Sequence, residues 1–303
     1  MRVNPLYMND LVGSLDTATA SETQLTEELG SGSRVNQLSD DPVAVGENVL
    51  LTAQISGDDT FSQTAASAQS MLQVTDSALS TVVSQLTSAI SVATEGSSGT
   101  LNASDLESIG NQLSGIRDEV LSLANTTYMG QYIFAGSQGG AAVAPFTLNT
   151  ATTPAGVTYN GDDTVNSTSY LETPSGQKIQ LNIPGDQIFL ANGSSVLGTL
   201  NALVADFSSG TVSPTAEADT QSLSAALSHV SQQQVLVDNS LSRLNTAQTY
   251  TQGESAQLTA AQTTLLQANM GQVATQLSTA ETQQAALSQV IATLGKQSLF
   301  NDL

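Results

Sequence analysis

The positions of the prolines constrain this 303-residue chain more than any other feature. The seven prolines leave two long tracts, Val43–Ala144 and Thr215–Leu303, without any. Because proline breaks a helix interior, long helices can run through those tracts. Eight of the twelve aromatic residues lie between Tyr128 and Phe207, a stretch that also holds four of the prolines. The distribution predicts a mainly α fold: a long helical-bundle or coiled-coil rod formed by the N- and C-terminal segments, with a central β-rich insertion.

Apolar residues recur at steps of three and four in both terminal segments, as in coiled-coil helices. The predicted seam positions are Met8, Leu11, Leu15, Leu25, Leu29, Met270, Val273, Leu277, Leu287, Ile291 and Leu294. Two such helices alone bury too little apolar surface to offset the entropy lost on ordering them. We therefore expect neighbouring subunits to complete this seam, although an intramolecular coiled coil without any partner is an alternative.

The flanking tracts carry signals for helix ends. Gly30 is expected to stop the first helix, and Asp41-Pro42 has the cap acid and first-turn proline that begin a second one. A capping box at Ser104–Glu107 predicts the start of a third helix. Gly253 and Gly271 are expected to bend the C-terminal helices, since glycine weakens a helix interior.

The second helix is expected to carry one buried seam. Its members are Phe61, Ala65, Ala68, Leu72, Thr75, Leu79, Val82, Leu86 and Ala89. Together with Leu106–Leu123 and Leu223–Leu244, this seam can form a self-sufficient helical bundle. In the insertion, Asn160-Gly161 predicts a hairpin between Val157–Tyr159 and the threonine-rich run that follows, and Gln177–Ile183 alternates like a strand.

These signals divide the chain into three expected domains. Residues 1–40 with 268–303 form a terminal coiled-coil assembly domain, and residues 41–140 with 213–267 form a helical-bundle rod. Residues 141–212 form a β-rich outer domain.

The charge balance excludes several classes of function. The chain has 6 Lys and Arg against 27 Asp and Glu, for a net charge of −21, so nucleic acid and anionic membranes are not expected partners. Polar residues interrupt Met1–Ala20, and no apolar run approaches the roughly 18 residues of a membrane span. We therefore expect neither a standard secretory signal nor a transmembrane helix.

No pattern predicts catalysis, a metal or a cofactor. The chain has no cysteine, and its only histidine, His229, lies far in sequence from other candidate ligands. Of the three Asp-Asp pairs, Asp40-Asp41 is expected to cap a helix and Asp58-Asp59 to lie on a solvated helix face. Asp162-Asp163 follows Asn160-Gly161 in an expected turn, and none of the pairs has EF-hand spacing. A hydrolase is accordingly a remote alternative.

A series of short motifs in order along the chain carries a family resemblance. They are Leu29–Asn36, Ser39–Ala44, Gly115–Glu119, Leu123–Asn125, Gly130–Gly136, Ala144–Phe146, Tyr159–Gly161, Ile183–Phe189, Ser242–Asn245 and Gln297–Phe300. The motif residues taken as family markers are Asp40, Asp41, Pro42, Arg117, Asn125, Phe134 and Gly136. With these motifs the chain resembles the flagellin superfamily, and within it the hook-filament junction family more than filament flagellins.

The resemblance implies a secreted structural protein of the bacterial flagellum at the hook-filament junction. Its implied partners are hook-associated protein 1, flagellin, further copies of itself in a tube, and a cytoplasmic chaperone for type III export. Filament flagellin is the first alternative, and a secreted adhesin or another type III secreted protein is more remote.

Overall fold

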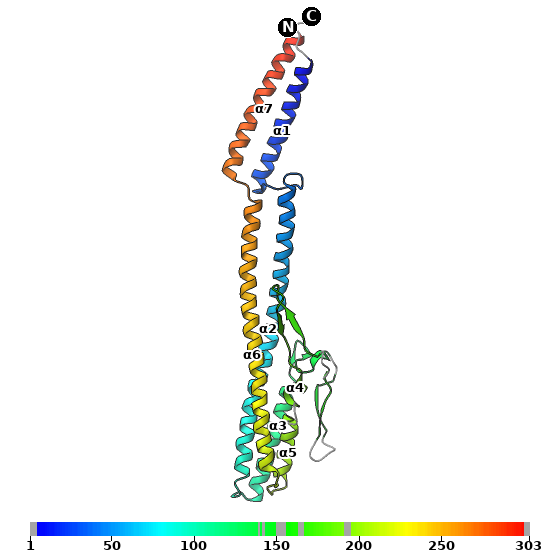
Figure 1. Cartoon of the computed structure of the whole chain (residues 1–303), viewed down its shortest axis with the longest axis vertical. Coiled ribbons are helices and arrows are strands. Elements are labelled where there is room, and N and C mark those ends of the chain that lie inside the picture. The colour runs from blue at the N-terminus through cyan, green and yellow to red at the C-terminus, as the bar shows by residue number, and fades with distance from the viewer. Residues whose placement is uncertain are drawn as a thin grey trace. The chain divides into compact units, whose positions relative to one another are not determined.

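The computed structural model in Figure 1 describes residues 5–138, 140, 143–149, 156–162, 167–190 and 195–299. Long helices dominate these residues, which confirms the mainly α fold with a small strand-containing segment between them. The chain forms two compact units, Met1–Gly57 with Gly253–Leu303 and Asp58–Gln252. The units divide inside helices α2 (Pro42–Gly96) and α6 (Ala216–Leu266), so the expected three-domain division stays a prediction.

The first unit contains two antiparallel helices, α1 (Pro5–Ser31) and α7 (Met270–Leu299). They lie side by side, with the start of α1 and the end of α7 at the same end of the pair (Figure 1). The Gln284 amide donates to the Thr19 hydroxyl at 3.2 Å across this pair. Phe300, at the end of the last sequence motif, lies outside the described residues.

Helix α1 ends two residues later than expected. Gly30 is inside the helix, and Gly32 adopts the left-handed conformation with φ +70°. The Gly32 amide donates to the Glu28 carbonyl at 2.9 Å, which satisfies one of the last open carbonyls of the helix. The prediction of Gly30 as the stop was wrong because helical geometry tolerates Gly30, whereas Gly32 supplies the positive φ that the turn requires.

A short backbone bridge ties the two connections within the first unit. Ser33 pairs with Gln267, the Arg34 amide donates to the Leu266 carbonyl at 2.7 Å, and the Ala268 amide donates to the Gly32 carbonyl at 3.0 Å. The end of α1 and the end of α6 are therefore held together where the chain enters and leaves the α1–α7 pair.

Helices α2 and α7 begin with side-chain caps. The Asp41 carboxylate accepts from the Ala44 amide at 3.0 Å with Pro42 in the first turn, which confirms the predicted start of α2. At α7, the Asn269 side chain accepts from the Gln272 amide at 3.2 Å. Gly271 accordingly lies in the first turn of α7, and Gly253 lies inside the uninterrupted α6.

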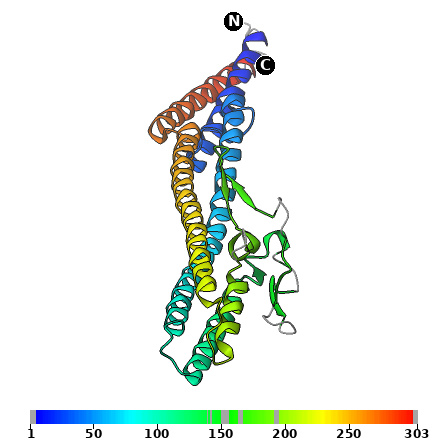
Figure 2. The ribbon, with the colours of Figure 1, turned by 60° about the horizontal axis from the view of Figure 1, so that its bottom comes forward.

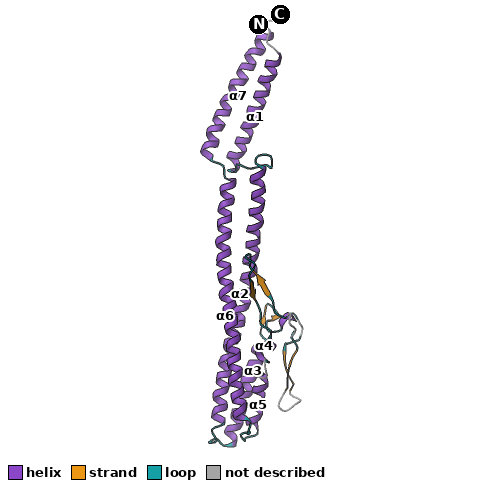
Figure 3. Cartoon of the chain, in the orientation of Figure 1, coloured by secondary structure: helices purple, strands orange, loops and turns teal. Residues whose placement is uncertain are grey.

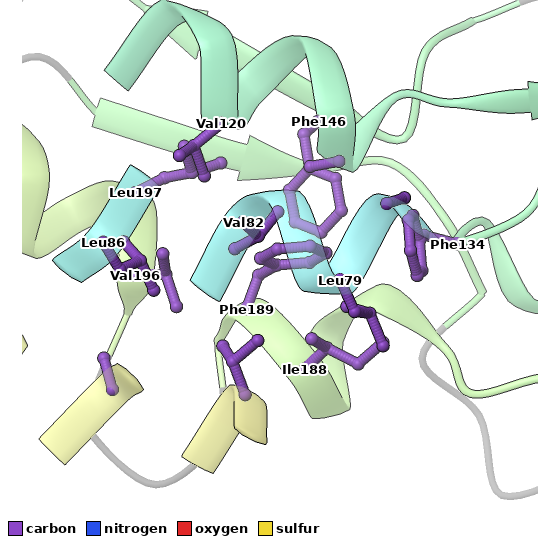
Figure 4. Packing of buried hydrophobic residues seen from close by; sticks show 14 of the residues in the cluster. Leu79, Val82, Leu86, Val120, Phe134, Phe146, Ile188, Phe189, Val196 and Leu197 are labelled. Atoms are coloured by element: carbon purple, nitrogen blue, oxygen red, sulfur yellow. The ribbon is translucent and has the colours of Figure 1, made fainter. Parts of the chain in front are cut away.

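The second unit packs the rest of α2 and α6 with α3 (Ala103–Ala124) and α5 (Val196–Ser208). All nine predicted seam residues of α2 between Phe61 and Ala89 are buried, which confirms that stripe. Figure 4 shows Leu79, Val82 and Leu86 of α2 packed with residues of the neighbouring segments. The predicted capping box at Ser104–Glu107 was wrong in its position. Asn102 caps α3 instead, since its side chain accepts from the Asp105 amide at 3.0 Å.

Among its described residues, the strand-containing segment has three separate two-stranded antiparallel ladders (Figure 3). They pair β1 (Thr127–Tyr128) with β2 (Gln131–Tyr132), β3 (Phe146–Asn149) with β4 (Gly156–Tyr159), and β5 (Tyr170–Glu172) with β6 (Lys178–Gln180). The short helices η1 (Gly136–Gln138) and α4 (Gly185–Phe189) complete the segment, which lies to one side of the helices in Figure 2.

The hairpin prediction at Asn160-Gly161 was wrong about its partner. Val157–Tyr159 does form a strand, but it pairs with the preceding β3. The Asn160 amide group donates back to the Ala144 carbonyl at 3.2 Å and so closes the open end of this ladder. Residues 163–166, part of the run expected to supply the second strand, lie outside the described residues. Gln177–Ile183 contains β6, as its alternation predicted.

Candidate assembly interface

The α1–α7 pair carries the predicted seam, and most of its members are only half covered. Met8, Leu11, Leu15 and Leu25 of α1 are half-buried, as are Leu277, Leu287, Ile291 and Leu294 of α7, whereas Val273 is buried. Leu29 and Met270 are exposed, at 36% and 43%, and lie at the end of the pair next to the backbone bridge. The structure thus brings nine of the eleven seam residues towards one contact and leaves two outside it.

The burial of this pair contrasts with that of the second unit. In α2, Leu72, Leu79 and Leu86 are at most 2% exposed. The half-buried leucines of α1 and α7 retain part of their solvent contact. Each therefore contributes less to stability than the roughly 1.5–3 kcal/mol that full burial of such a side chain provides. The seam therefore offers apolar surface that a further helix can cover.

A groove of about 440 Å³ runs between α1 and α7. Its lining residues are Ser21, Gln24, Leu25, Glu28, Thr275, Gln276, Thr279, Ala280 and Gln283. Most of these side chains are polar, and the Gln24 amide donates to the Glu28 carboxylate at 3.1 Å inside it. The two helices consequently do not interlock tightly at this level, which leaves room for side chains from outside the chain.

Arg34, which follows α1, links the start of α2 to the end of α6. Its guanidinium donates to the Asp41 carboxylate at 3.0 Å and to the Leu265 carbonyl at 3.3 Å. A cation at the C-terminal end of α6 and an anion at the first turn of α2 both complement the helix dipoles. The Ala44 amide and the Arg34 guanidinium hold the pKa of Asp41 below its usual value of 3.8. Sequence reasoning placed Arg34 in a motif but assigned it no role.

The family-marker residues Asp40, Asp41 and Pro42 shape the turn that precedes α2. The Asp40 carboxylate accepts from the amides of Asn36 at 3.0 Å and Gln37 at 2.8 Å. The turn is therefore closed by side chains of the motif itself.

The other family markers lie in the second unit and hold the strand-containing segment to the helices. Asn125, at the C-terminus of α3, donates to the Phe146 carbonyl and accepts from the Phe146 amide, both at 2.9 Å. Arg117 donates to the Asn201 side chain at 3.2 Å and so links α3 to α5. Both contacts give the markers a structural role within one chain.

Phe134 and Gly136 anchor the same segment. Phe134 is fully buried and meets Phe189 edge-on, with ring centroids 5.4 Å apart. Gly136 has φ +64°, and a Cβ there would lie 2.8 Å from the Asp162 carbonyl, so a side chain is excluded. The sequence placed Tyr159 in a motif but gave it no role, and in the structure its hydroxyl donates to the Phe134 carbonyl at 2.9 Å. Burial, and secondarily the nearby Asp186 charge, raises the pKa of Tyr159 to about 12.

The residues weighed for catalysis or metal binding do not converge. A His229 ring nitrogen lies 2.7 Å from the Gln187 carbonyl, and within the described residues no three His, Cys, Asp or Glu side chains form a metal-binding group. Asp58 was wrongly expected on a solvated face. It is 5% exposed, and burial together with the Asp59 charge raises its pKa. Over the described ranges, no helix is long and apolar enough to cross a bilayer.

The terminal helices α1 and α7, together with a helical unit that carries a small strand-containing insert, give the chain a flagellin-like fold. Residues 7–139 match the family described as the bacterial flagellin N-terminal helical region. The chain also resembles flagellar hook-associated protein 3 of Escherichia coli K12, with 28% identity over 73% of this chain and 70% of that protein. The predicted resemblance is thereby confirmed. Two flagellins, from Clostridium tyrobutyricum and Vibrio anguillarum, align over 45% and 44% of this chain.

Solved structures share the fold. A putative flagellar hook-associated protein from Vibrio parahaemolyticus superposes with a TM-score of 0.64 at 19% identity, covering 75% of this chain and 99% of that one. The flagellar junction protein FlgL from Legionella pneumophila superposes with a TM-score of 0.54 at 15% identity, covering 73% of this chain and all of that one.

Proposed function

We propose that this chain is a structural protein of the extracellular bacterial flagellum that joins the hook to the flagellin filament. The resemblance to hook-associated protein 3 extends over most of the chain, and the fold is that of the junction protein from Legionella pneumophila. Its work is mechanical and requires no catalytic group or cofactor.

The observation that carries the proposal is the half-open seam of the α1–α7 pair. Eight apolar side chains on these two helices keep part of their solvent contact. Neighbouring subunits in a tube would cover this surface and supply the burial that one pair lacks. The seam positions, from Met8 to Leu29 and from Met270 to Leu294, are accordingly the proposed assembly residues.

The proposed partners follow from the place of a junction protein. Copies of the chain would form a tube whose lower face meets hook-associated protein 1 and whose upper face meets flagellin. Before export through the flagellar type III apparatus, a cytoplasmic chaperone would cover the terminal helices. The three-domain division of the chain into assembly ends, rod and outer insert belongs to the same proposal.

Filament flagellin is the alternative within the same class. The two flagellins among the relatives align over 44–45% of this chain, whereas hook-associated protein 3 of Escherichia coli aligns over 73%. This difference favours the junction role. Purified monomer that grew into long filaments without any partner would favour flagellin instead.

Deletion of the gene tests the proposal. The junction role predicts cells with hooks but without filaments, with flagellin released into the medium, and motility restored by a plasmid copy of the gene. Filaments of normal length on the deletion strain would overturn it.

A further inference from the structure

A second cavity of the molecule lies in the second unit, far in sequence from the terminal seam. This pocket of about 440 Å³ is formed between the β5–β6 turn and helix α6. The turn contributes Thr173–Ser175 and Gln177, and α6 contributes residues between Ser242 and Thr251. Its volume falls within the range that small-molecule sites occupy in proteins.

Thr251, one of the residues of α6 that line the pocket, has a buried hydroxyl. It is 1% exposed, and its Oγ1 makes no hydrogen bond within the described residues. On the same helix, Thr246 and Thr249 donate to the carbonyls four residues back, each at 2.9 Å. Thr251 therefore differs from its neighbours, and a buried hydroxyl is unfavourable until something bonds to it.

The lining of the pocket has no negative charge, although the chain is strongly acidic. None of its ten lining residues is acidic, although the chain has 27 Asp and Glu. Among the basic side chains that the structure describes, Arg34 and Arg117 form ion pairs, and Lys178 lies opposite Glu172 across the β5–β6 ladder. Within the part of the chain that the structure describes, Arg243 makes one hydrogen bond, to the Lys178 carbonyl at 2.9 Å, which holds the guanidinium beside the turn. Its other N–H groups remain available for an anion.

One wall of the pocket is aromatic. Tyr250 lines it and is 64% exposed, so the ring offers an open amphipathic surface. The hydroxyls of Ser175 and Thr246 and the amide of Gln177 surround the same space and can both donate and accept hydrogen bonds.

We propose that this pocket binds a carboxylated sugar, with Arg243 on the carboxylate, Tyr250 against the ring and Thr251 bonded to a ring hydroxyl. A carboxylate matches the planar fork of a guanidinium. A purely apolar ligand would leave the Thr251 hydroxyl unpaired, and a polyanion would be repelled by a chain with a net charge of −21. This inference does not depend on the junction role.

Ligand-observed saturation-transfer NMR on the full chain tests the proposal with glucuronate, galacturonate and N-acetylneuraminate as probes. Glucose and acetate serve as comparison probes that lack the carboxylate and the ring, respectively. At least one sugar acid should bind, and more tightly than either comparison probe. Absence of binding by all three sugar acids, or equal binding of acetate or glucose, would overturn the assignment.

Three variants locate the site. Arg243→Gln should weaken sugar-acid binding by roughly tenfold or more, because a charge-assisted contact is lost. Tyr250→Ala and Thr251→Val should also weaken it, and Thr251→Val breaks no hydrogen bond within the chain. Tyr170→Ala is the matched control, because Tyr170 is 58% exposed on β5 and does not line the pocket. Equal binding by Arg243→Gln, Tyr250→Ala and unaltered protein, each with an unchanged melting temperature, would contradict the proposal.

Discussion

At the scale of single residues, Asn125 is the clearest link between the helices and the strand-containing segment. Its side chain makes two hydrogen bonds to the backbone of one residue, Phe146. Asn125→Ala removes both bonds and leaves two backbone groups without partners, so we expect a loss of about 1–3 kcal/mol of unfolding free energy. Chemical denaturation measures the loss. Asn111→Ala, on the exposed face of α3, should change stability by less than about 0.5 kcal/mol. Equal effects of the two variants would contradict this role.

Two carboxyl pairs in the second unit make stability depend on pH. Burial, and then the Asp76 charge, raises the pKa of Asp238 above 3.8, and burial with Asp206 raises that of Asp219. The folded chain therefore binds more protons than the unfolded chain between pH 3.8 and the raised values, so these groups make stability fall as pH rises through that window. Lowering the pH from neutral into this window should therefore raise the free energy of unfolding.

The variant Asp238→Asn isolates one of these pairs. It keeps the shape of the side chain and removes its charge, so the melting temperature near neutral pH should increase slightly. The variant should also gain less stability than the unaltered chain when the pH falls from 7 to 4.5. Melting curves at a series of pH values test this. An unchanged pH dependence in Asp238→Asn would show that the Asp76–Asp238 pair carries none of the effect.

Among the helices, α2 stabilises the monomer through its buried stripe, whereas α1 and α7 are proposed to be stabilised by contacts with neighbouring molecules. Leu15 and Leu287 are half-buried in the α1–α7 pair, whereas Leu86 is fully buried in α2. Leu15→Asp or Leu287→Asp should leave the main thermal transition of dilute monomer nearly unchanged and abolish assembly. Leu86→Asp should unfold the second unit, because it buries an unpaired charge.

Calorimetry and electron microscopy of the assembly reaction distinguish these outcomes. A large drop in the main melting transition for Leu287→Asp in dilute monomer would support the self-contained coiled coil instead. Normal assembly of both charge variants would show that the seam is not the assembly surface.

The elements that could be predicted from the sequence are those with a long, uniform period. The stripe from Phe61 to Ala89 was predicted in full because its members recur at every third or fourth position, all of them apolar except Thr75, and packing in the second unit buries them. Short-range signals were less reliable. Asn160-Gly161 suggested a hairpin to the following residues, but the core placed Phe146 against Tyr159, with ring centroids 5.0 Å apart, and this contact selected the preceding strand.

The candidate site was predictable in part. The heptad pattern located the seam on α1 and α7, but it could not show that Leu29 and Met270 lie beyond the contact. That outcome depends on the bridge between Ser33 and Gln267, which joins segments more than 230 residues apart. Neither the Arg34 contacts nor the pocket at Thr251 has a local sequence signature, because each is made by residues distant along the chain.

At the scale of the whole molecule, the net charge of −21 opposes the association of identical copies. Salt shortens the Debye length from about 30 Å at 0.01 M to about 8 Å at 0.15 M and screens this repulsion. We therefore expect assembly with purified partners to be slower at 0.01 M than at 0.15 M salt. Light scattering measures the rates. Faster assembly at low salt would indicate that attraction between opposite charges drives the contact.

Hydrogen exchange on dilute monomer tests the central claim, that the terminal helices obtain their burial from neighbouring molecules. We expect rapid exchange along α1 and α7 and strong protection in α3 and in the stretch of α2 from Phe61 to Ala89. We also expect α1 and α7 to gain protection on assembly. Protection of both terminal helices in the monomer equal to that of α3 would contradict the claim.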